Sequence, residues 1–321
     1  MINHSEIPVV LTIAGSDSGG EAGIQADLKT FSSLNVFGTS AITCITAQNS
    51  NKVNGIEPIS PDMICLQIKT VCDGFRIAAV KTGILYSSEI ILAVSKTVSA
   101  CGITRLVVDP VMAATSGARL LQEEAVEILC SELLPKAMVI TPNVPEAEIL
   151  CGHNINSIDE MKTAAHEIGE KFGTACVVKG GHLGTEDRGQ KTGDRSQESG
   201  VRRQETGVRR QESGVRGQET GVRGQEFDIE NKVIDVLYNN SKITVFSLPR
   251  VDAIKTHGTG CVFSAALSAF LARGEQLAQA VKHAKEFVTE ALKIIRIPHK
   301  RIITSQPWLF QQLPQNLPDH E

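Results

Sequence analysis

The segment Pro8-Val9-Val10-Leu11-Thr12-Ile13-Ala14-Gly15-Ser16-Asp17-Ser18-Gly19-Gly20 decides the fold expected for this chain. Its first half is a β-branched run typical of a strand, and the run breaks at Ala14 into a polar, glycine-rich turn. The apolar residues that follow recur at helical spacing on one face, and they are Ile24, Leu28, Phe31 and Leu34. The segment therefore predicts a strand, a glycine-rich turn and a helix, with Asp27 off the apolar face of that helix.

The same order of strand, polar turn and helix recurs as far as residue 183. Strands are predicted over residues 39–46, 77–80, 105–108, 138–140 and 175–178, and helices from Ser60, over 88–100, over 123–134 and from Ser157. This alternation predicts an α/β protein with a mostly parallel sheet, whose ligands bind beyond the carboxyl ends of the strands. The residues expected at that edge are Gly15, Asp17, Lys81, Asp109, Asn143 and Lys179.

Composition narrows the class of protein further. Hydrophobic residues make up 41% of the 321 residues but aromatic residues only 4%, which favours a core of Val, Ile, Leu and Ala between a sheet and its helices. The net charge of −4 gives no electrostatic reason to expect nucleic acid or an anionic membrane as partner. The eight cysteines include no CxxC pair, which indicates that they are reduced thiols. No apolar run in the sequence is long enough to cross a bilayer. We therefore expect a cytoplasmic protein.

Residues 186–226 interrupt the pattern with about six copies of a seven-residue unit, clearest in Gly200-Val201-Arg202-Arg203-Gln204-Glu205-Thr206. One valine per unit at most is too little apolar surface to offset the entropy of ordering, so we expect a disordered surface insertion. An arginine-glycine RNA tether is the alternative, but nine basic residues stand against eight acidic ones.

Order is predicted to return in a hairpin formed by residues 233–238 and 242–247, followed by the turn Thr256-His257-Gly258-Thr259-Gly260-Cys261. A run of small and apolar residues follows this turn, which indicates a helix N-terminus that could bind an anion. Cys261 falls in the first turn of that helix, where the pKa of a thiol is typically lowered. The plainer interpretation is a glycine turn before a packed helix, with Cys261 as a buried structural residue.

These residues favour phosphoryl transfer without a Walker A loop. Asp109, Asn143 and Glu146 supply the hard oxygen ligands that could hold Mg²⁺ directly or through water, and Lys179 adds a cation. The amides of residues 258–260 would form an anion hole, and such transfer depends mostly on positioning and charge neutralisation. The sequence also excludes a zincin-type zinc site. That site would begin at His166-Glu167 and needs a second ligand at position 170, where this chain has Glu170.

The chain resembles the hydroxymethylpyrimidine/phosphomethylpyrimidine kinases of thiamin biosynthesis, a branch of the ribokinase-like superfamily. The matching stretches run in family order: residues 14–20, 22–31, 46–49, 109–112, 141–143, 145–148, 179–183 and 256–261. The resemblance implies a three-layer α/β/α fold with helices on both faces of the sheet. It implies one discontinuous kinase domain over residues 1–185 and 227–295, with the insertion at 186–226 and a tail at 296–321.

The resemblance also implies a role for each matched residue. Asp27 and Gln48 would hydrogen-bond the aminopyrimidine, with Thr46, Ile84 and Val111 around its ring. Cys261 would be the general base, and Gly258 and Gly260 would form the anion hole. Lys179, Asn143 and Thr259 would bind the phosphates of ATP, and Glu146 and Asp109 would hold Mg²⁺, partly through water.

Ile84 departs from the family, which often has methionine there; this is a conservative change in a ring pocket. The implied reaction is ATP- and Mg²⁺-dependent phosphorylation of 4-amino-5-hydroxymethyl-2-methylpyrimidine and then of its monophosphate, by a homodimer. A pyridoxine/pyridoxal kinase is the nearest alternative, and a catalytically silent nucleotide-binding protein on the same fold is another.

Overall fold

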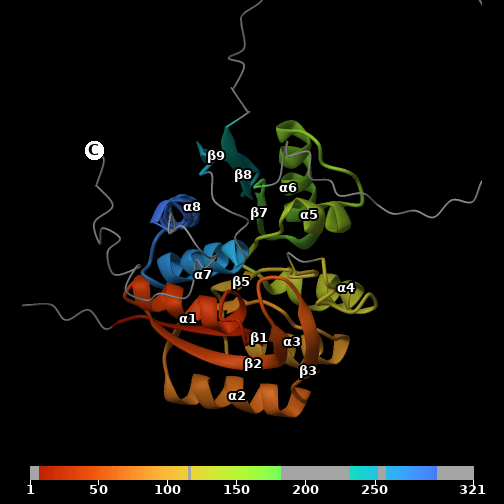
Figure 1. Cartoon of the computed structure of the whole chain (residues 1–321), viewed down its shortest axis with the longest axis vertical. Coiled ribbons are helices and arrows are strands. Elements are labelled where there is room, and N and C mark those ends of the chain that lie inside the picture. The colour runs from red at the N-terminus through yellow and green to blue at the C-terminus, as the bar shows by residue number, and fades with distance from the viewer. Residues whose placement is uncertain (1–6, 115–116, 182–230, 252–257, 295–321) are drawn as a thin grey trace, which may run out of the picture.

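A computed structural model describes residues 7–114, 117–181, 231–251 and 258–294 (Figure 1). These residues form a nine-stranded sheet of order β3-β2-β1-β4-β5-β6-β7-β8-β9. The strands β2, β1, β4, β5, β6 and β7 run parallel, and β3, β8 and β9 add antiparallel edges. The strands are β1 (Val9–Asp17), β2 (Phe37–Gln48), β3 (Val53–Pro58), β4 (Ile77–Thr82), β5 (Leu106–Val108), β6 (Val139–Ile140), β7 (Ala175–Lys179), β8 (Lys232–Asn239) and β9 (Lys242–Pro249). The predicted parallel α/β sheet is confirmed.

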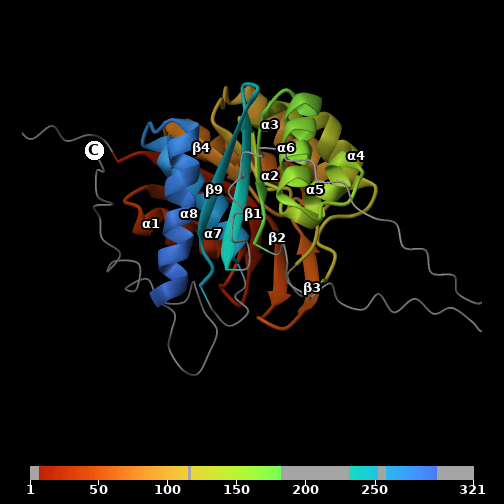
Figure 2. The same cartoon turned by 90° about the horizontal axis from the view of Figure 1, so that it is seen from above.

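Helices cover both faces of the sheet, as Figure 2 shows. They are α1 (Gly23–Ser33), α2 (Pro61–Gly74), α3 (Ser88–Ala100), α4 (Ala125–Ile128), α5 (Val144–Cys151), α6 (Ile158–Phe172), α7 (Thr259–Ala272) and α8 (Leu277–Ile294). Successive side chains of a strand point to opposite faces. Accordingly Val107 and Val177 pack with α7 and α8, whereas Leu106, Val108 and Val178 belong to the core formed with α2, α3, α5 and α6. The sheet and the helices on its two faces therefore form the three-layer α/β/α arrangement that the family resemblance implies.

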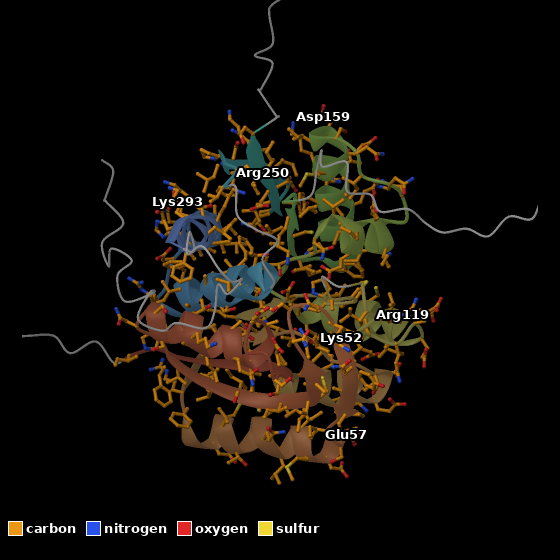
Figure 3. All side chains as sticks on the ribbon, in the orientation of Figure 1. Lys52, Glu57, Arg119, Asp159, Arg250 and Lys293 are labelled. Atoms are coloured by element: carbon orange, nitrogen blue, oxygen red, sulfur yellow. The ribbon has the colours of Figure 1, made fainter. Side chains whose placement is uncertain are left out.

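The predicted helix starts are confirmed by their caps. The Ser60 side chain accepts from the Met63 amide ahead of α2, and Ser157 and Glu160 form a capping box at the start of α6. Each cap satisfies backbone N–H groups that the first turn of a helix leaves without a partner. Charged side chains such as Asp159, in the first turn of α6, and Arg119 are exposed on the outside of the molecule (Figure 3).

Four elements differ from the predictions. β1 continues through the glycine turn to Asp17, because a bulge between Ala14 and Ser16 keeps it paired with β2. β3 and α5 were not predicted; β3 gains its order from antiparallel pairing with β2 rather than from its own glycine- and proline-containing sequence. The helix predicted over 123–134 is α4 followed by a π-helical turn (Leu129–Leu133) and a 3-10 turn (Leu134–Lys136) that contains Pro135.

The chain leaves the sheet after β7 and returns to it at β8, and these two strands pair antiparallel. The predicted insertion at 186–226, the tail at 296–321 and residues 256 and 257 of the glycine turn lie outside the described residues. Across the described ranges, no helix combines the length and the apolar character needed to cross a membrane.

Candidate active site

The carboxyl ends of the strands open into a cavity of about 260 Å³ at the N-terminus of α7. Eleven of the thirteen site residues predicted from sequence line it: Gln48, Ile84, Asp109, Val111, Asn143, Glu146, Lys179, Gly258, Thr259, Gly260 and Cys261. They come from both halves of the chain, before and after residues 182–230. Of the six residues predicted at the strand ends, Asp109, Asn143 and Lys179 line the cavity, whereas Gly15, Asp17 and Lys81 do not.

Gly258 begins α7 in a conformation that only glycine fits. Its φ is +80°, and a Cβ atom there would lie 1.9 Å from the Glu21 carbonyl oxygen. The first hydrogen bond within the helix is the one that the Val262 amide donates to the Gly258 carbonyl. The N–H groups of Thr259, Gly260 and Cys261 therefore have no acceptor inside the helix, which is the geometry an anion site requires.

Lys179 brings a cation to this helix end. Its Nζ lies 3.4 Å from the position of a Cβ added at Gly260, and 2.9 Å from Asp109 Oδ1. Ser264 donates to the other oxygen of Asp109 at 3.0 Å. Burial lowers the pKa of Lys179, but the Asp109 and Glu146 carboxylates outweigh it and hold that pKa above its ordinary value. The lysine is therefore a permanent cation at neutral pH.

Asn143 and Glu146 form the capping box of α5. The Asn143 side chain accepts from the Glu146 amide at 2.9 Å, and Glu146 Oε2 accepts from the Asn143 amide at 2.9 Å. The Met112 amide donates to Glu146 Oε1 at 3.4 Å. Burial raises the pKa of Glu146 to about 7. Both Glu146 and Asp109 line the cavity, so their carboxylates could hold Mg²⁺ directly or through water.

Cys261 lies in the first turn of α7, but the expected lowering of its pKa is wrong. Burial raises the pKa of the Cys261 thiol to about 11, and the Lys81 ammonium offsets that only in part. The desolvation of a thiolate in this pocket outweighs the helix N-terminus. Cys261 is a protonated thiol at neutral pH.

A sequence profile of the family described as phosphomethylpyrimidine kinase matches residues 17–217 and 216–303. The chain belongs to the phosphomethylpyrimidine kinase family. The hydroxymethylpyrimidine/phosphomethylpyrimidine kinase of Bacillus subtilis is 39% identical over 88% of this chain and 88% of that protein. The kinase family membership predicted from the sequence motifs is thereby confirmed.

Two solved structures show the same fold. Bacillus subtilis pyridoxal kinase in an ADP complex is 35% identical with a TM-score of 0.71, covering 92% of this chain and 95% of that one. The phosphomethylpyrimidine kinase of Clostridium difficile is 34% identical with a TM-score of 0.66, covering 89% and 99%. The expected ribokinase-like fold is confirmed.

Two predicted residues of this kinase do not line the cavity. Thr46 is buried and donates to the Ser16 carbonyl at 3.0 Å and to Gln48 Oε1 at 3.4 Å, so it orients Gln48. Asp27 is completely buried, and its carboxylate accepts from Thr12 Oγ1 at 2.6 Å and from Lys81 Nζ at 2.8 Å. A direct contact of either side chain with the substrate stays a prediction.

Replacing Asp27 with Ala is expected to lower the free energy of unfolding by about 3–5 kcal/mol, because the Lys81 ammonium would stay buried without its partner. Urea denaturation measures this loss. The double variant Asp27→Leu, Lys81→Met should lose less, since neither charge remains. A single variant as stable as the parent would show that the pair contributes nothing.

Besides Lys179 and Asp109, a second ion pair lines the cavity, and the sequence analysis did not predict it. Lys285 Nζ lies 2.7 Å from Asp235 Oδ2, and Asp235 Oδ1 accepts from the Gly180 amide at 3.0 Å. Both side chains line the cavity, on β8 and α8. The signal in the sequence was a carboxylate inside the apolar run Val233–Leu237, where an unpaired charge would be costly.

Proposed function

We propose that this kinase transfers the γ-phosphoryl group of ATP to the hydroxyl group of 4-amino-5-hydroxymethyl-2-methylpyrimidine, and then phosphorylates the monophosphate, in thiamin biosynthesis. One observation carries the proposal. Lys179 lies at the N-terminus of α7, which follows Gly258, in a cavity that Gln48 also lines. Family membership and a relative named for both phosphorylation steps support the substrate. The similarity to an ADP complex supports the nucleotide.

The phosphates would bind at Lys179, Asn143 and the free amides that begin α7, near Thr259. The substrate oxygen attacks the γ-phosphorus while the bond to the leaving ADP oxygen breaks, and negative charge spreads over the transferred group. Lys179 and the free amides at the start of α7 would neutralise that charge from fixed positions, which is the main contribution a protein makes to this reaction. Glu146 and Asp109 would hold Mg²⁺ directly or through water, and the ion would supply positive charge next to the phosphates.

Cys261 would accept the proton of the substrate hydroxyl as transfer begins. A thiol with a pKa of about 11 is ionised in roughly one molecule in 10⁴ at pH 7, but its thiolate is a strong base. The proposal therefore implies a rate that rises with pH well above neutrality.

The ring of the substrate would lie against Ile84 and Val111, which border the cavity next to Gln48. An amide side chain both donates and accepts, so Gln48 can pair with an amino group and an adjacent ring nitrogen. The Thr46 hydroxyl contacts the Gln48 amide at 3.4 Å and helps to hold that side chain in place.

Replacing Gln48 with Ala should lower kcat/KM for the aminopyrimidine by about 5- to 150-fold, the cost of roughly 1–3 kcal/mol for lost hydrogen bonds. Thr46→Val, which removes only the orienting contact, should cost less. Pyridoxal lacks the amino group and should lose less than the aminopyrimidine in the Gln48 variant. Equal losses for both substrates would contradict this placement of the ring.

A pyridoxal kinase remains the second candidate, favoured by the similarity to the B. subtilis enzyme of that name. The test is a coupled assay of ADP release in which the full chain receives the aminopyrimidine, its monophosphate or pyridoxal at equal concentrations. Preferred turnover of the two pyrimidines supports the proposal, preferred turnover of pyridoxal supports the alternative, and no turnover of any would indicate a silent nucleotide-binding protein.

The proposal includes a cytoplasmic homodimer. All eight cysteines are unpaired thiols in the structure, as a reducing compartment requires. The dimer rests on resemblance to the family, and sedimentation at equilibrium would measure the mass of the particle directly.

A further inference from the structure

Three donor groups of different chemistry converge outside the catalytic cavity, where the turn after α5 packs on α6. Cys151 is the last residue of α5, His153 follows in the turn, and Glu167 lies in α6. One ligand atom from each lies within 4.8 Å of the others. Figure 1 shows α5 and α6 side by side, apart from α7 and α8, and none of the three residues lines the cavity.

The imidazole of His153 is oriented as in known metal sites. Its Nδ1 lies 3.2 Å from the Asn154 carbonyl oxygen, and its Nε2 lies 2.8 Å from Glu167 Oε2. A ligating histidine characteristically directs its other ring nitrogen at a carbonyl or carboxylate. Either ring nitrogen satisfies this pattern. With Nε2 as the ligand atom, the ion would replace the hydrogen bond to Glu167, whose carboxylate could then share the ion.

The spacing is close to that of a tetrahedral zinc site. Bonds of about 2.3 Å to sulfur and 2.0–2.1 Å to nitrogen place tetrahedral ligands about 3.3–3.8 Å apart. The donors lie 4.8 Å or less from one another, so the widest pair needs to approach by about 1–1.5 Å, while His153 Nε2 and Glu167 Oε2, 2.8 Å apart, need to separate by about 0.5 Å. The Cys151 thiol has only weak partners to give up, the carbonyls of His153 at 3.5 Å and Glu148 at 3.9 Å.

The turn that carries His153 is held in place at both ends. Gly152 ends α5 in the left-handed conformation, with φ +85°, and its amide donates to the Glu148 carbonyl. Beyond His153, the Ile155 side chain is completely buried and its amide donates to Glu148 Oε1 at 2.8 Å. The histidine therefore reaches the site without an ordering cost for the whole turn.

We propose that Cys151, His153 and Glu167 bind one Zn²⁺-class cation, with water in the fourth position. A thiolate, a neutral imidazole and a carboxylate balance the charge of a divalent ion, and the sulfur selects zinc or cobalt over magnesium or calcium. The ion would fasten the C-terminal end of α5 to α6. The other end of α5 is the Asn143–Glu146 box, about 12 Å away for eight residues, so the site is separate from the proposed catalysis.

The test is a titration of the full chain, freed of metal with a chelator, with Co²⁺. The parent should bind one equivalent with a thiolate-to-cobalt charge-transfer band, which Zn²⁺ then abolishes by displacement. Cys151→Ser should lose the band, and His153→Gln or Glu167→Gln should weaken binding by at least about 10-fold. Cys130→Ser, another partly exposed cysteine, should bind like the parent.

Thermal unfolding gives a second readout that does not depend on the band. Zn²⁺ should raise the midpoint of the parent and of Cys130→Ser but not that of Cys151→Ser, provided circular dichroism shows that all three are folded. A parent without the band, or a band that persists in Cys151→Ser, would overturn the site. Unchanged cobalt affinity in both the His153 and Glu167 variants would overturn it as well.

Discussion

Lys179→Met is expected to lower kcat by roughly 10²–10³-fold, the effect typical of removing one preorganised group that stabilises transition-state charge. Lys179 is the cation at the N-terminus of α7, with its Nζ 3.4 Å from the position of a Cβ added at Gly260. Its charge acts on the transferred phosphoryl group, where negative charge is greatest in the transition state. Steady-state kinetics with saturating ATP measures the loss.

A structural explanation has to be separated from this one, because Lys179 also neutralises buried Asp109 at 2.9 Å. The single variant leaves that carboxylate unpaired and should be less stable as well as slower. The double variant Lys179→Met, Asp109→Asn removes both charges and should recover stability but not turnover. Because Asp109 is itself a proposed Mg²⁺ ligand, the turnover of the double variant is compared with that of Asp109→Asn alone, and equal turnover would mean that Lys179 acts only by holding Asp109.

The fold could be predicted because its signals are local. Alternating apolar strands and amphipathic helices, with caps at Ser60 and Ser157, are written into short stretches of sequence. β3 was missed because its order comes from pairing with β2 rather than from its own residues. α5 was not predicted, because Asn143 and Glu146, which form its capping box, were interpreted as metal ligands.

The residues that line the candidate site could be predicted from the sequence, but the interactions between their charges could not. Strand ends and a glycine turn are visible in sequence, and the resemblance to a known family added Gln48, Ile84 and Val111, so eleven of its residues could be named. The partner of each charge was not visible: Asp27 faces Lys81, which lies 54 positions away, and Asp109 faces Lys179, 70 positions away. Burial is likewise a property of the whole fold. It reverses the direction of the pKa shift at Cys261 that the helix N-terminus alone suggests.

Cys261→Ala is expected to lower kcat by roughly 10²–10⁴-fold while nucleotide affinity stays close to that of the parent. The substitution keeps Gly258, Gly260 and the free amides of the α7 N-terminus, so it removes the proposed base without removing the anion site. Equilibrium binding of ADP checks the second half of this expectation. A structural cysteine would show the opposite pattern, with lower stability and near-normal turnover.

The pH dependence separates a base from a packing residue. Because the pKa of the Cys261 thiol is about 11, the fraction of thiolate grows tenfold per pH unit from pH 8 to 10, and log kcat/KM of the parent should rise with it. Glu146, with a pKa of about 7, is already ionised there and adds no slope. Cys261→Asp places a carboxylate that is ionised at neutral pH, so it should regain part of the rate with a flat profile over the same range. A parent profile that is flat from pH 8 to 10, or an alanine variant that melts and turns over like the parent, would exclude Cys261 as the base.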